Sequence, residues 1–272
     1  MAHAASTRLV ALLGDPVAHS VSPQIHAAAF AARGLDLAYL AFGVAHERLA
    51  DAVRGLGALG AVGANVTVPH KVAVLRLADT VAEEAAAVGA ANTLVWGAGG
   101  LVADNTDAPG LVRVLTGELG LEPGEPVVLF GAGGAALAAA VALGRVGARV
   151  EVVARQAEAA AAVAERVADA GGEMGPAAHP RLVVNATPLG LHGEPLPDRF
   201  MHLHADQVAL DLVYGPEPTP FLRAAAAAGA RAIDGRTLLV AQAALSFEIW
   251  TGLEAPLDAM AAAADAALAA KH

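Results

Sequence analysis

The chain is predicted to be an α/β protein with two domains, because three observations agree. Short apolar runs of strand length alternate with alanine-rich helical segments through almost the whole sequence, which is typical of α/β proteins. One glycine-rich turn follows an apolar run directly and opens a helix, as in a dinucleotide-binding βαβ unit. The length of 272 residues is enough for two domains of ordinary size.

Composition excludes several classes of function. Apolar residues make up 56% of the chain and aromatic residues only 4%, so the cores must pack mainly through aliphatic contacts. No cysteine is present, which excludes disulfides, thiolate metal sites and a cysteine nucleophile, and no metal site is expected. The net charge is −10, without a basic stretch, so a nucleic acid is not an expected partner.

Two uncharged stretches are as long as a membrane span, at residues 85–103 and 126–144. Glycines interrupt both, and Asn92 lies within the first, so they are interpreted as buried strands, turns and helices. The apolar run at residues 9–13 is too short for the core of a signal peptide. We therefore expect a cytoplasmic protein without a membrane partner.

The order of elements follows from apolar periodicity, proline and glycine positions and capping residues. In the first part of the chain we expect a strand at 9–13, a helix with Ser22 as N-cap and Pro23 at its first position, a strand at 37–42, a helix at 46–56, a strand at 61–66, a helix opening at Pro69, and a hairpin of 92–96 and 101–103. Later elements are a helix at 109–119, strands at 127–130 and 150–153 around a helix, strands at 182–185, 208–213 and 230–233, and a helix at 237–250.

The glycine-rich turn carries the pattern G-x-G-x-x-A, in the order Gly131, Ala132, Gly133, Gly134, Ala135, Ala136. The first glycine permits the turn, the second lets the backbone approach a pyrophosphate, and the small last residue allows close packing of the helix. Amides at the helix N-terminus meet the phosphate charge. The alternative is a glycine-rich turn without a ligand.

The residue at the ribose position distinguishes NAD from NADP. Counting about 20 residues from the glycines reaches Glu151, but Glu151 lies near the start of its strand, whereas the ribose should lie beyond the strand's end. Arg155 is found there, without an acidic neighbour. A guanidinium binds a 2′-phosphate through two parallel hydrogen bonds, so NADP is favoured. The alternative is a solvated arginine.

Polar clusters follow three of the expected strands in the first hundred or so residues. Ser20 and Ser22 flank a helix start, where hydroxyls and free amides can hold a carboxylate. Lys71 follows the strand at 61–66, and Asp107 precedes a later helix; together they form a simple proton donor for a developing alkoxide. Taken singly, each has an ordinary alternative, as a surface lysine or a helix cap.

These motifs together resemble the shikimate dehydrogenase family, and the resemblance runs nearly from end to end. The similar segments, in order, are 14–23 (GDPVAHSVSP), 65–71 (NVTVPHK), 89–93 (GAANT), 105–107 (NTD), 185–188 (NATP), 211–214 (DLVY) and 235–242, which holds Gly235 and LLVAQ. The resemblance implies a substrate domain, 1–106 and 236–272, completed by C-terminal helices, with an inserted Rossmann-type NADP-binding domain, 107–235.

The resemblance also implies a reaction and roles for individual residues. The reaction is the reversible, NADPH-dependent reduction of 3-dehydroshikimate to shikimate at the C3 carbonyl, a step toward the aromatic amino acids. Lys71 and Asp107 would transfer the proton. Groups that would bind the substrate are Ser20, Ser22 and Tyr214 for the carboxylate and Thr67, Asn92, Asp107 and Gln242 for ring hydroxyls. Groups that would bind the cofactor are Gly131, Ala132, Gly133, Gly134, Ala135, Arg155, Asn185, Thr187, Leu212, Gly235 and Glu83.

Alternatives within and outside the family stay open. A quinate or aminoshikimate dehydrogenase would share every motif. The presence of Ser22 favours shikimate over quinate as the substrate. A catalytically silent NADP-binding or regulatory protein has no need of both Lys71 and Asp107. Where the family commonly has Asn-Arg-Thr, this chain has Ala154-Arg155-Gln156, without a second basic residue soon after, which weakens the NADP preference. We expect a monomer or a homodimer.

Overall fold

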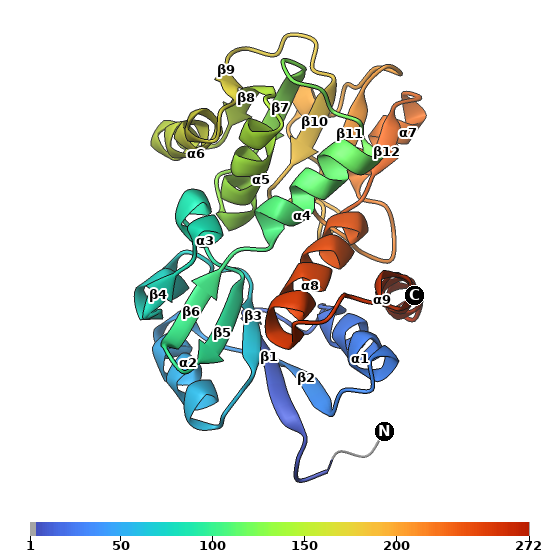
Figure 1. Cartoon of the computed structure of the whole chain (residues 1–272). Coiled ribbons are helices and arrows are strands. Elements are labelled where there is room, and N and C mark those ends of the chain that lie inside the picture. Colours follow the sequence, from blue (N-terminus) through green and yellow to red (C-terminus); the bar gives the residue numbers. More distant parts are fainter. Residues whose placement is uncertain (1–3, 272) are drawn as a thin grey trace. The chain divides into compact units, whose positions relative to one another are not determined.

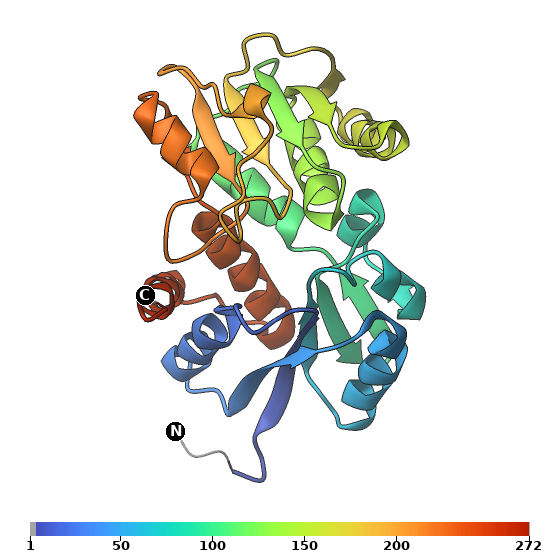
Figure 2. The ribbon, with the colours of Figure 1, turned by 180° about the vertical axis from the view of Figure 1, so that it is seen from behind.

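The computed structural model describes residues 4–271 and divides into two compact units (Figures 1 and 2). Unit 1 comprises Met1–Thr106 with Val240–His272, and unit 2 comprises Asp107–Leu239. The second boundary lies four residues later than the 236 given above, inside a helix.

Unit 1 contains a six-stranded mixed sheet with the strand order β2-β1-β3-β5-β6-β4 within the described residues. Its strands are β1 (Arg8–Gly14), β2 (Leu37–Gly43), β3 (Gly63–Val66), β4 (Thr80–Val81), β5 (Thr93–Gly97) and β6 (Gly100–Asp104). Its helices are α1 (Ser22–Ala32), α2 (Leu49–Ala58), α3 (Glu83–Val88), most of α8 (Arg236–Thr251), and α9 (Leu257–Ala269). Short 3₁₀ turns are η1 (His46–Arg48) and η2 (Ala73–Leu77).

Aromatic side chains fill one face of this sheet. His26 and Phe30 of α1 meet Tyr39 of β2 and Phe247 and Trp250 of α8. Their ring centroids lie 4.4–6.3 Å apart, the range of favourable aromatic pairs. This packing connects α8, which lies near the end of the chain, to elements from the first forty residues.

Gly63 of β3 is required by this packing, because a Cβ there would lie 2.1 Å from Nε1 of Trp250. The indole N–H donates to the carbonyl of Leu94 at 3.0 Å, so the ring contacts both β3 and β5. On the opposite face, Leu49, Val53 and other apolar residues of α2 join the core of the sheet.

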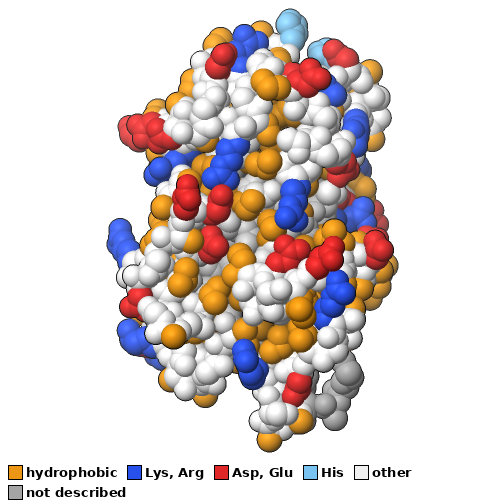
Figure 3. Space-filling model, viewed as in Figure 1, with side chains coloured by type: hydrophobic (Ala, Val, Ile, Leu, Met, Phe, Trp, Pro, Cys, Tyr) orange, Lys and Arg blue, Asp and Glu red, His pale blue; other side chains and the backbone are white. Residues whose placement is uncertain are grey.

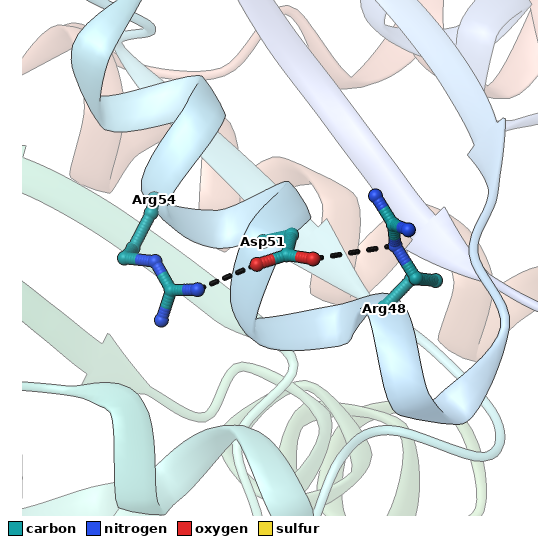
Figure 4. Close-up of polar contacts among 3 residues, drawn as sticks. All are labelled: Arg48, Asp51 and Arg54. Atoms are coloured by element: carbon teal, nitrogen blue, oxygen red, sulfur yellow. Dashed lines mark hydrogen bonds and ion pairs between the residues drawn. The ribbon is translucent and has the colours of Figure 1, made fainter.

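The exposed side of α2 carries a small charge cluster. Asp51 lies between Arg48, at 3.3 Å, and Arg54, at 2.5 Å (Figure 4). The three side chains are more than half exposed, so we expect the two ion pairs to add little to stability.

Unit 2 contains a parallel sheet of six strands with the order β12-β11-β10-β7-β8-β9 within the described residues. Its strands are β7 (Pro126–Phe130), β8 (Arg149–Val153), β9 (Glu173–Met174), β10 (Leu182–Asn185), β11 (Val208–Asp211) and β12 (Arg231–Ile233). Its helices are α4 (Asp107–Arg113), continued by the π-helical turn η3 (Val114–Glu118), α5 (Gly134–Arg145), α6 (Ala157–Asp169) and α7 (Pro220–Ala227), with a 3₁₀ turn η4 (Asp198–Phe200). Read from β9, the order is the doubly wound Rossmann order, in which the direction of winding reverses between β7 and β10.

Small residues let helix α5 approach its neighbours closely. Most of α5 from Ala136 to Gly144 is buried, and a Cβ on Gly144 would lie 2.5 Å from the carbonyl oxygen of Val167 in α6. On the sheet face opposite, the ring of Phe130 stacks on Phe200 at 4.5 Å. The contact between α5 and α6 is therefore made by alanine and glycine, whereas Phe130 and Phe200 pack through their aromatic rings.

Several sequence-based expectations need correction. The helix expected to open at Pro69 is absent: residues 69–72 form turns, followed by the 3₁₀ turn η2. The carbonyls of Val68 and Lys71 accept the N–H groups of Asp15 and Ala91, so the backbone of this segment is directed toward other strands and loops rather than along a helix. The segment 46–56 begins with a 3₁₀ turn before α2, and the helix expected at 109 begins at Asp107.

Ser22 is not the N-cap of α1. Val21 holds that position, and Ser22 is the first helical residue. The hydroxyl of Ser20 accepts the N–H of Ser22 at 3.2 Å, so Ser20 satisfies one of the amides that lack a helical partner.

The surface shows no extended field of one charge on the face in Figure 3, where Lys and Arg side chains are interspersed with Asp and Glu. Among residues 4–271, no helix combines the length and apolar character that crossing a membrane requires.

Candidate active site

The polar residues of unit 1 meet at one edge of its sheet because of strand register. Asn65, near the end of β3, pairs with Thr93, at the start of antiparallel β5, and Thr93 pairs with Asp104, at the end of β6. Chain segments that leave β3 and β6 and enter β5 therefore lie side by side. They carry the motifs 65–71, 89–93 and 105–107.

The loop after β3 is held by bonds to three other segments. The N–H of Thr67 donates to the carbonyl of Leu13 in β1 at 2.9 Å, and a Cβ on Gly14 would lie 2.3 Å from the Thr67 methyl carbon. The buried ring of His70 bonds the carbonyl of Val44 through Nε2 at 2.7 Å. The Lys71 carbonyl accepts the N–H of Ala91 at 2.8 Å. These contacts fix the backbone that presents Thr67 and Lys71.

Asn92 lies at the centre of a buried polar network. Its Oδ1 accepts the backbone N–H of Thr106 at 2.8 Å and the Thr93 hydroxyl at 3.0 Å. Its Nδ2 donates to the Thr106 hydroxyl at 2.9 Å and to Oε1 of Gln242, in α8, at 3.3 Å. The structure thus brings together two of the residues expected to bind substrate, Asn92 and Gln242.

Lys71 and Asp107 are linked to this network through the backbone. Lys71 is bonded to Ala91, the neighbour of Asn92, and Asp107 directly follows Thr106. Lys71 is half-buried, and Asp107 is 8% exposed as the first residue of α4. Lys71 belongs to unit 1, whereas Asp107 is the first residue of unit 2.

Ser20 and Ser22 lie at the start of α1, with their hydroxyl oxygens 3.2 Å apart. No acidic side chain lies in the first turn of α1, and Val21 provides no side-chain cap. Paired hydroxyls at a helix N-terminus that carries no acidic side chain suit a carboxylate. Tyr214, the third residue expected there, belongs to unit 2, after β11.

In unit 2, the glycine-rich turn connects β7 to α5. Gly131 has φ 138°, and a Cβ there would lie 2.7 Å from the carbonyl oxygen of Ala186, so only glycine fits. Gly133 is the N-cap of α5, has no side-chain cap, and would place a Cβ in open space. The turn therefore offers room and helix amides for a diphosphate, which fits a dinucleotide.

Arg155 and Glu151 occupy different environments beside this turn. Glu151 accepts the N–H of Ala177 at 2.9 Å and pairs with Arg199 at 3.2 Å, so its carboxylate is already engaged. Arg155 is exposed just beyond Val153, whose carbonyl accepts the N–H of Gly131 at 2.9 Å. Arg155 therefore lies next to the turn, on the chain that leaves β8.

Asn185 and Thr187 are engaged in bonds within unit 2. The Asn185 amide donates to Asp211 at 2.8 Å and to Leu189 at 3.0 Å, and its oxygen accepts the Thr187 hydroxyl at 2.7 Å. Asp211 also accepts the Thr219 hydroxyl at 2.6 Å. Burial raises the pKa of Asp211 to about 6, opposed by these hydrogen bonds. Asn185 and Thr187 thus shape the loop after β10.

Leu212 and Gly235 lie next to each other in unit 2. A Cβ on Gly235 would lie 2.5 Å from the Leu212 carbonyl oxygen, and the N–H of Leu212 donates to the carbonyl of Asn185 at 2.9 Å. Glu83, by contrast, is an exposed residue at the start of α3, in unit 1. Among the described residues, no group of three potential ligands could hold a metal ion.

Comparison with known proteins identifies the family. The family model of the shikimate dehydrogenase substrate binding domain matches residues 12–94, and that of the shikimate 5'-dehydrogenase C-terminal domain matches residues 235–264. A curated shikimate dehydrogenase (NADP(+)) from Anaeromyxobacter sp. (strain Fw109-5) is 48% identical, over 94% of this chain and 95% of its own. The chain belongs to the shikimate dehydrogenase family.

Solved members of the shikimate dehydrogenase family share this fold throughout. The enzyme from Thermus thermophilus, in complex with NADP(H) and shikimate, has a TM-score of 0.85 and 39% identity, covering 96% of this chain and 100% of that one. A shikimate dehydrogenase in complex with NADP+ has a TM-score of 0.90 and 33% identity, covering 98% of both chains. The prediction of a two-domain α/β fold with a Rossmann unit is confirmed.

Sequence reasoning missed three residues that support the site in this family member. Tyr39 donates to Oδ1 of Asn65 at 2.8 Å, Ser246 receives Nδ2 of Asn65 at 3.0 Å, and His26 stacks on Tyr39. Only Ser246 carried a signal, because it is a polar residue one helical turn after Gln242 in an otherwise apolar stretch.

Proposed function

We propose that the chain catalyses the reversible, NADP-dependent oxidation of shikimate to 3-dehydroshikimate. The observation that carries the proposal is the fixed cluster in unit 1, where the loop of Lys71 is bonded to the segment of Asn92, in a chain of this family. Its relatives carry the name shikimate dehydrogenase (NADP(+)), and solved structures contain shikimate and NADP(H).

The family resemblance gives each polar group a proposed task. The Ser20 and Ser22 hydroxyls hold the substrate carboxylate at the start of α1, with Tyr214 as a further contact. Thr67, Asn92 and Gln242 bind ring hydroxyls. Lys71 donates a proton to the carbonyl oxygen at C3 during reduction, or accepts it during oxidation. Asp107 binds a ring hydroxyl and shares the proton transfer with Lys71.

The nicotinamide cofactor supplies or accepts the hydride when bound. Unit 2 holds its diphosphate at Gly131, Ala132, Gly133, Gly134 and Ala135, where the turn leaves space in front of the α5 amides. Arg155 would bind the 2′-phosphate, and its neighbours in the sequence, Ala154 and Gln156, carry no charge. Leu212 and Gly235 contact the nicotinamide through backbone groups, while Asn185 and Thr187 hold the adjoining loop. Glu83 lies in unit 1 and is a cofactor contact only by family resemblance.

Steady-state kinetics test the proposal directly. Purified protein is assayed for nucleotide reduction by absorbance with shikimate or quinate, each with NADP or NAD, and its mass in solution is measured alongside. We expect the highest kcat/KM for shikimate with NADP. Absence of turnover with all four pairs would refute an enzymatic role, and a higher kcat/KM for quinate would reassign the substrate.

A further inference from the structure

A single hydroxyl group in α8, that of Ser246, contacts four groups of the network around Asn92. Ser246 is fully buried, and its Oγ lies 2.9 Å from the Thr93 hydroxyl and 3.1 Å from the Thr106 hydroxyl. It receives Nδ2 of Asn65 at 3.0 Å and lies 3.1 Å from the carbonyl oxygen of Gln242. One oxygen therefore joins β3, β5, the end of β6 and α8.

Backbone groups decide how the two asparagine amides point. The Asn92 carbonyl can only accept, so the Asn65 atom 3.0 Å from it is Nδ2, and Asn65 Oδ1 is left to accept the Tyr39 hydroxyl. The N–H of Thr106 can only donate, so the Asn92 atom 2.8 Å from it is Oδ1. Both amides therefore have one orientation, and Nδ2 of Asn92 is the group directed at Gln242.

Ser246 contacts the two hydroxyls that hold the Asn92 side chain. Both hydroxyls that bond the Asn92 side chain, those of Thr93 and Thr106, also lie within hydrogen-bond distance of Ser246. The bond from Asn92 to Gln242 Oε1 is 3.3 Å, long for a hydrogen bond, and Gln242 is only half-buried. A substrate hydroxyl can take the place of that bond, accepting from Asn92 and donating to Gln242.

We propose that Ser246 is a positioning residue whose hydroxyl fixes the Asn92 carboxamide, and the turn of α8 that carries Gln242, toward one hydroxyl of the substrate. The proposal rests on the proposed function, because Asn92 and Gln242 are taken as the substrate contacts. Ser246 itself touches no substrate. Without it, Asn65, Thr93 and Thr106 each lose a neighbour within hydrogen-bond distance in a buried place, and the two hydroxyls that bond the Asn92 side chain are no longer held from the side of α8.

The chain offers a matched control in the same helix. Thr251 donates to the Phe247 carbonyl four residues earlier at 2.8 Å and accepts the N–H of Leu253 at 3.2 Å, but it lies outside the network. The hydroxyl oxygen of Ser246 has the Gln242 carbonyl in the equivalent position, at 3.1 Å. Thr251→Ala therefore removes the same kind of helical side-chain bond without disturbing Asn92. Comparing Ser246→Ala with Thr251→Ala separates positioning from a general loss in α8.

The decisive measurement is a double-mutant comparison of kinetics. Ser246→Ala should lower kcat/KM for shikimate about tenfold and leave NADP affinity unchanged, whereas Thr251→Ala should change kcat/KM less than about twofold. In an Asn92→Ala background, Ser246→Ala should have less than about a twofold further effect, because the two residues act as one unit. Independent, multiplicative losses would overturn the proposal.

A second readout does not depend on turnover. The Asn92 side-chain amide is assigned in ¹H–¹⁵N spectra from its loss in Asn92→Ala, and its hydrogen exchange is measured. Exchange should be at least about tenfold faster in Ser246→Ala and unchanged in Thr251→Ala. Unchanged exchange in Ser246→Ala overturns the positioning role even if shikimate is turned over. Faster exchange in a protein that does not oxidise shikimate supports positioning and refutes the proposed function alone.

Discussion

His26 should make unit 1 sensitive to acid. The side chain is fully buried against Tyr39, Phe30 and Trp250, and neither ring nitrogen has a hydrogen-bond partner. Burial lowers the pKa of His26 from 6.5 to about 3, against a weaker opposing effect of Asn65. Between these values the unfolded chain binds a proton that the folded chain does not, so stability is intact above about pH 6.5 and is lost as pH falls.

The magnitude follows from the size of the shift. Each pH unit below about 6.5 removes about 1.4 kcal/mol, so lowering the pH to about 4.5 removes about 2.7 kcal/mol from the folded state. His26→Phe keeps an aromatic ring against Tyr39 without buried nitrogens, so it should abolish this part of the pH dependence. It should also raise stability at neutral pH, where two unsatisfied polar atoms are removed.

Urea unfolding between about pH 7.5 and about pH 4.5 measures the effect. The two units can unfold separately, so the transition of unit 1 is followed through the fluorescence of Trp250 and Trp96, both in that unit. His179→Phe, at an exposed histidine, is the control and should track the unmodified protein. Parallel pH profiles for His26→Phe and the unmodified protein would refute the reasoning.

Three further predictions concern the candidate active site. Lys71→Ala should lower kcat by about 10²- to 10⁴-fold with a much smaller change in substrate KM, and a folded variant with near-normal kcat would exclude Lys71 as the proton-transfer group. Replacing Ser20 and Ser22 together by Ala should weaken shikimate binding by about 1–3 kcal/mol, and a calorimetric titration that shows weaker NADPH binding instead would assign them to the cofactor. Arg155→Ala should raise KM for NADP by about ten- to a hundredfold and leave KM for NAD nearly unchanged, because one charge-assisted contact to the 2′-phosphate is lost. Equal weakening of both cofactors would show that Arg155 does not bind that phosphate.

Local patterns predicted the elements whose hydrogen bonds are themselves local. The βαβ unit around Gly131 and the hairpin of β5 and β6 were predicted within a residue or two, because strand length, glycine and helical period act within short segments. The prediction of a helix that opens at Pro69 was wrong because hydrogen bonds of that segment reach residues distant in the sequence. Two carbonyls at that segment, those of Val68 and Lys71, are bonded to Asp15 and Ala91, which lie far away in the sequence.

The support of the site could not be predicted from the sequence for the same reason. Ser246 meets Asn65 across 181 residues and Thr93 across 153. No periodicity links such positions, and a serine in an apolar helix or a histidine on an apolar helix face has many ordinary explanations. The motif residues were identified because they form short, recognisable segments, whereas Tyr39, His26 and Ser246 contribute single side chains.

During synthesis, the two segments of unit 1 are separated in time, because the residues of unit 2 lie between them in the sequence. The aromatic face of its sheet is complete only when Phe247 and Trp250 are present, and unit 2 is made in between. During translation, β1 to β6 emerge first and keep that face uncovered while more than a hundred residues are added. The Rossmann unit can therefore fold first, and the nascent N-terminal sheet is an expected site for chaperone binding until α8 leaves the ribosome.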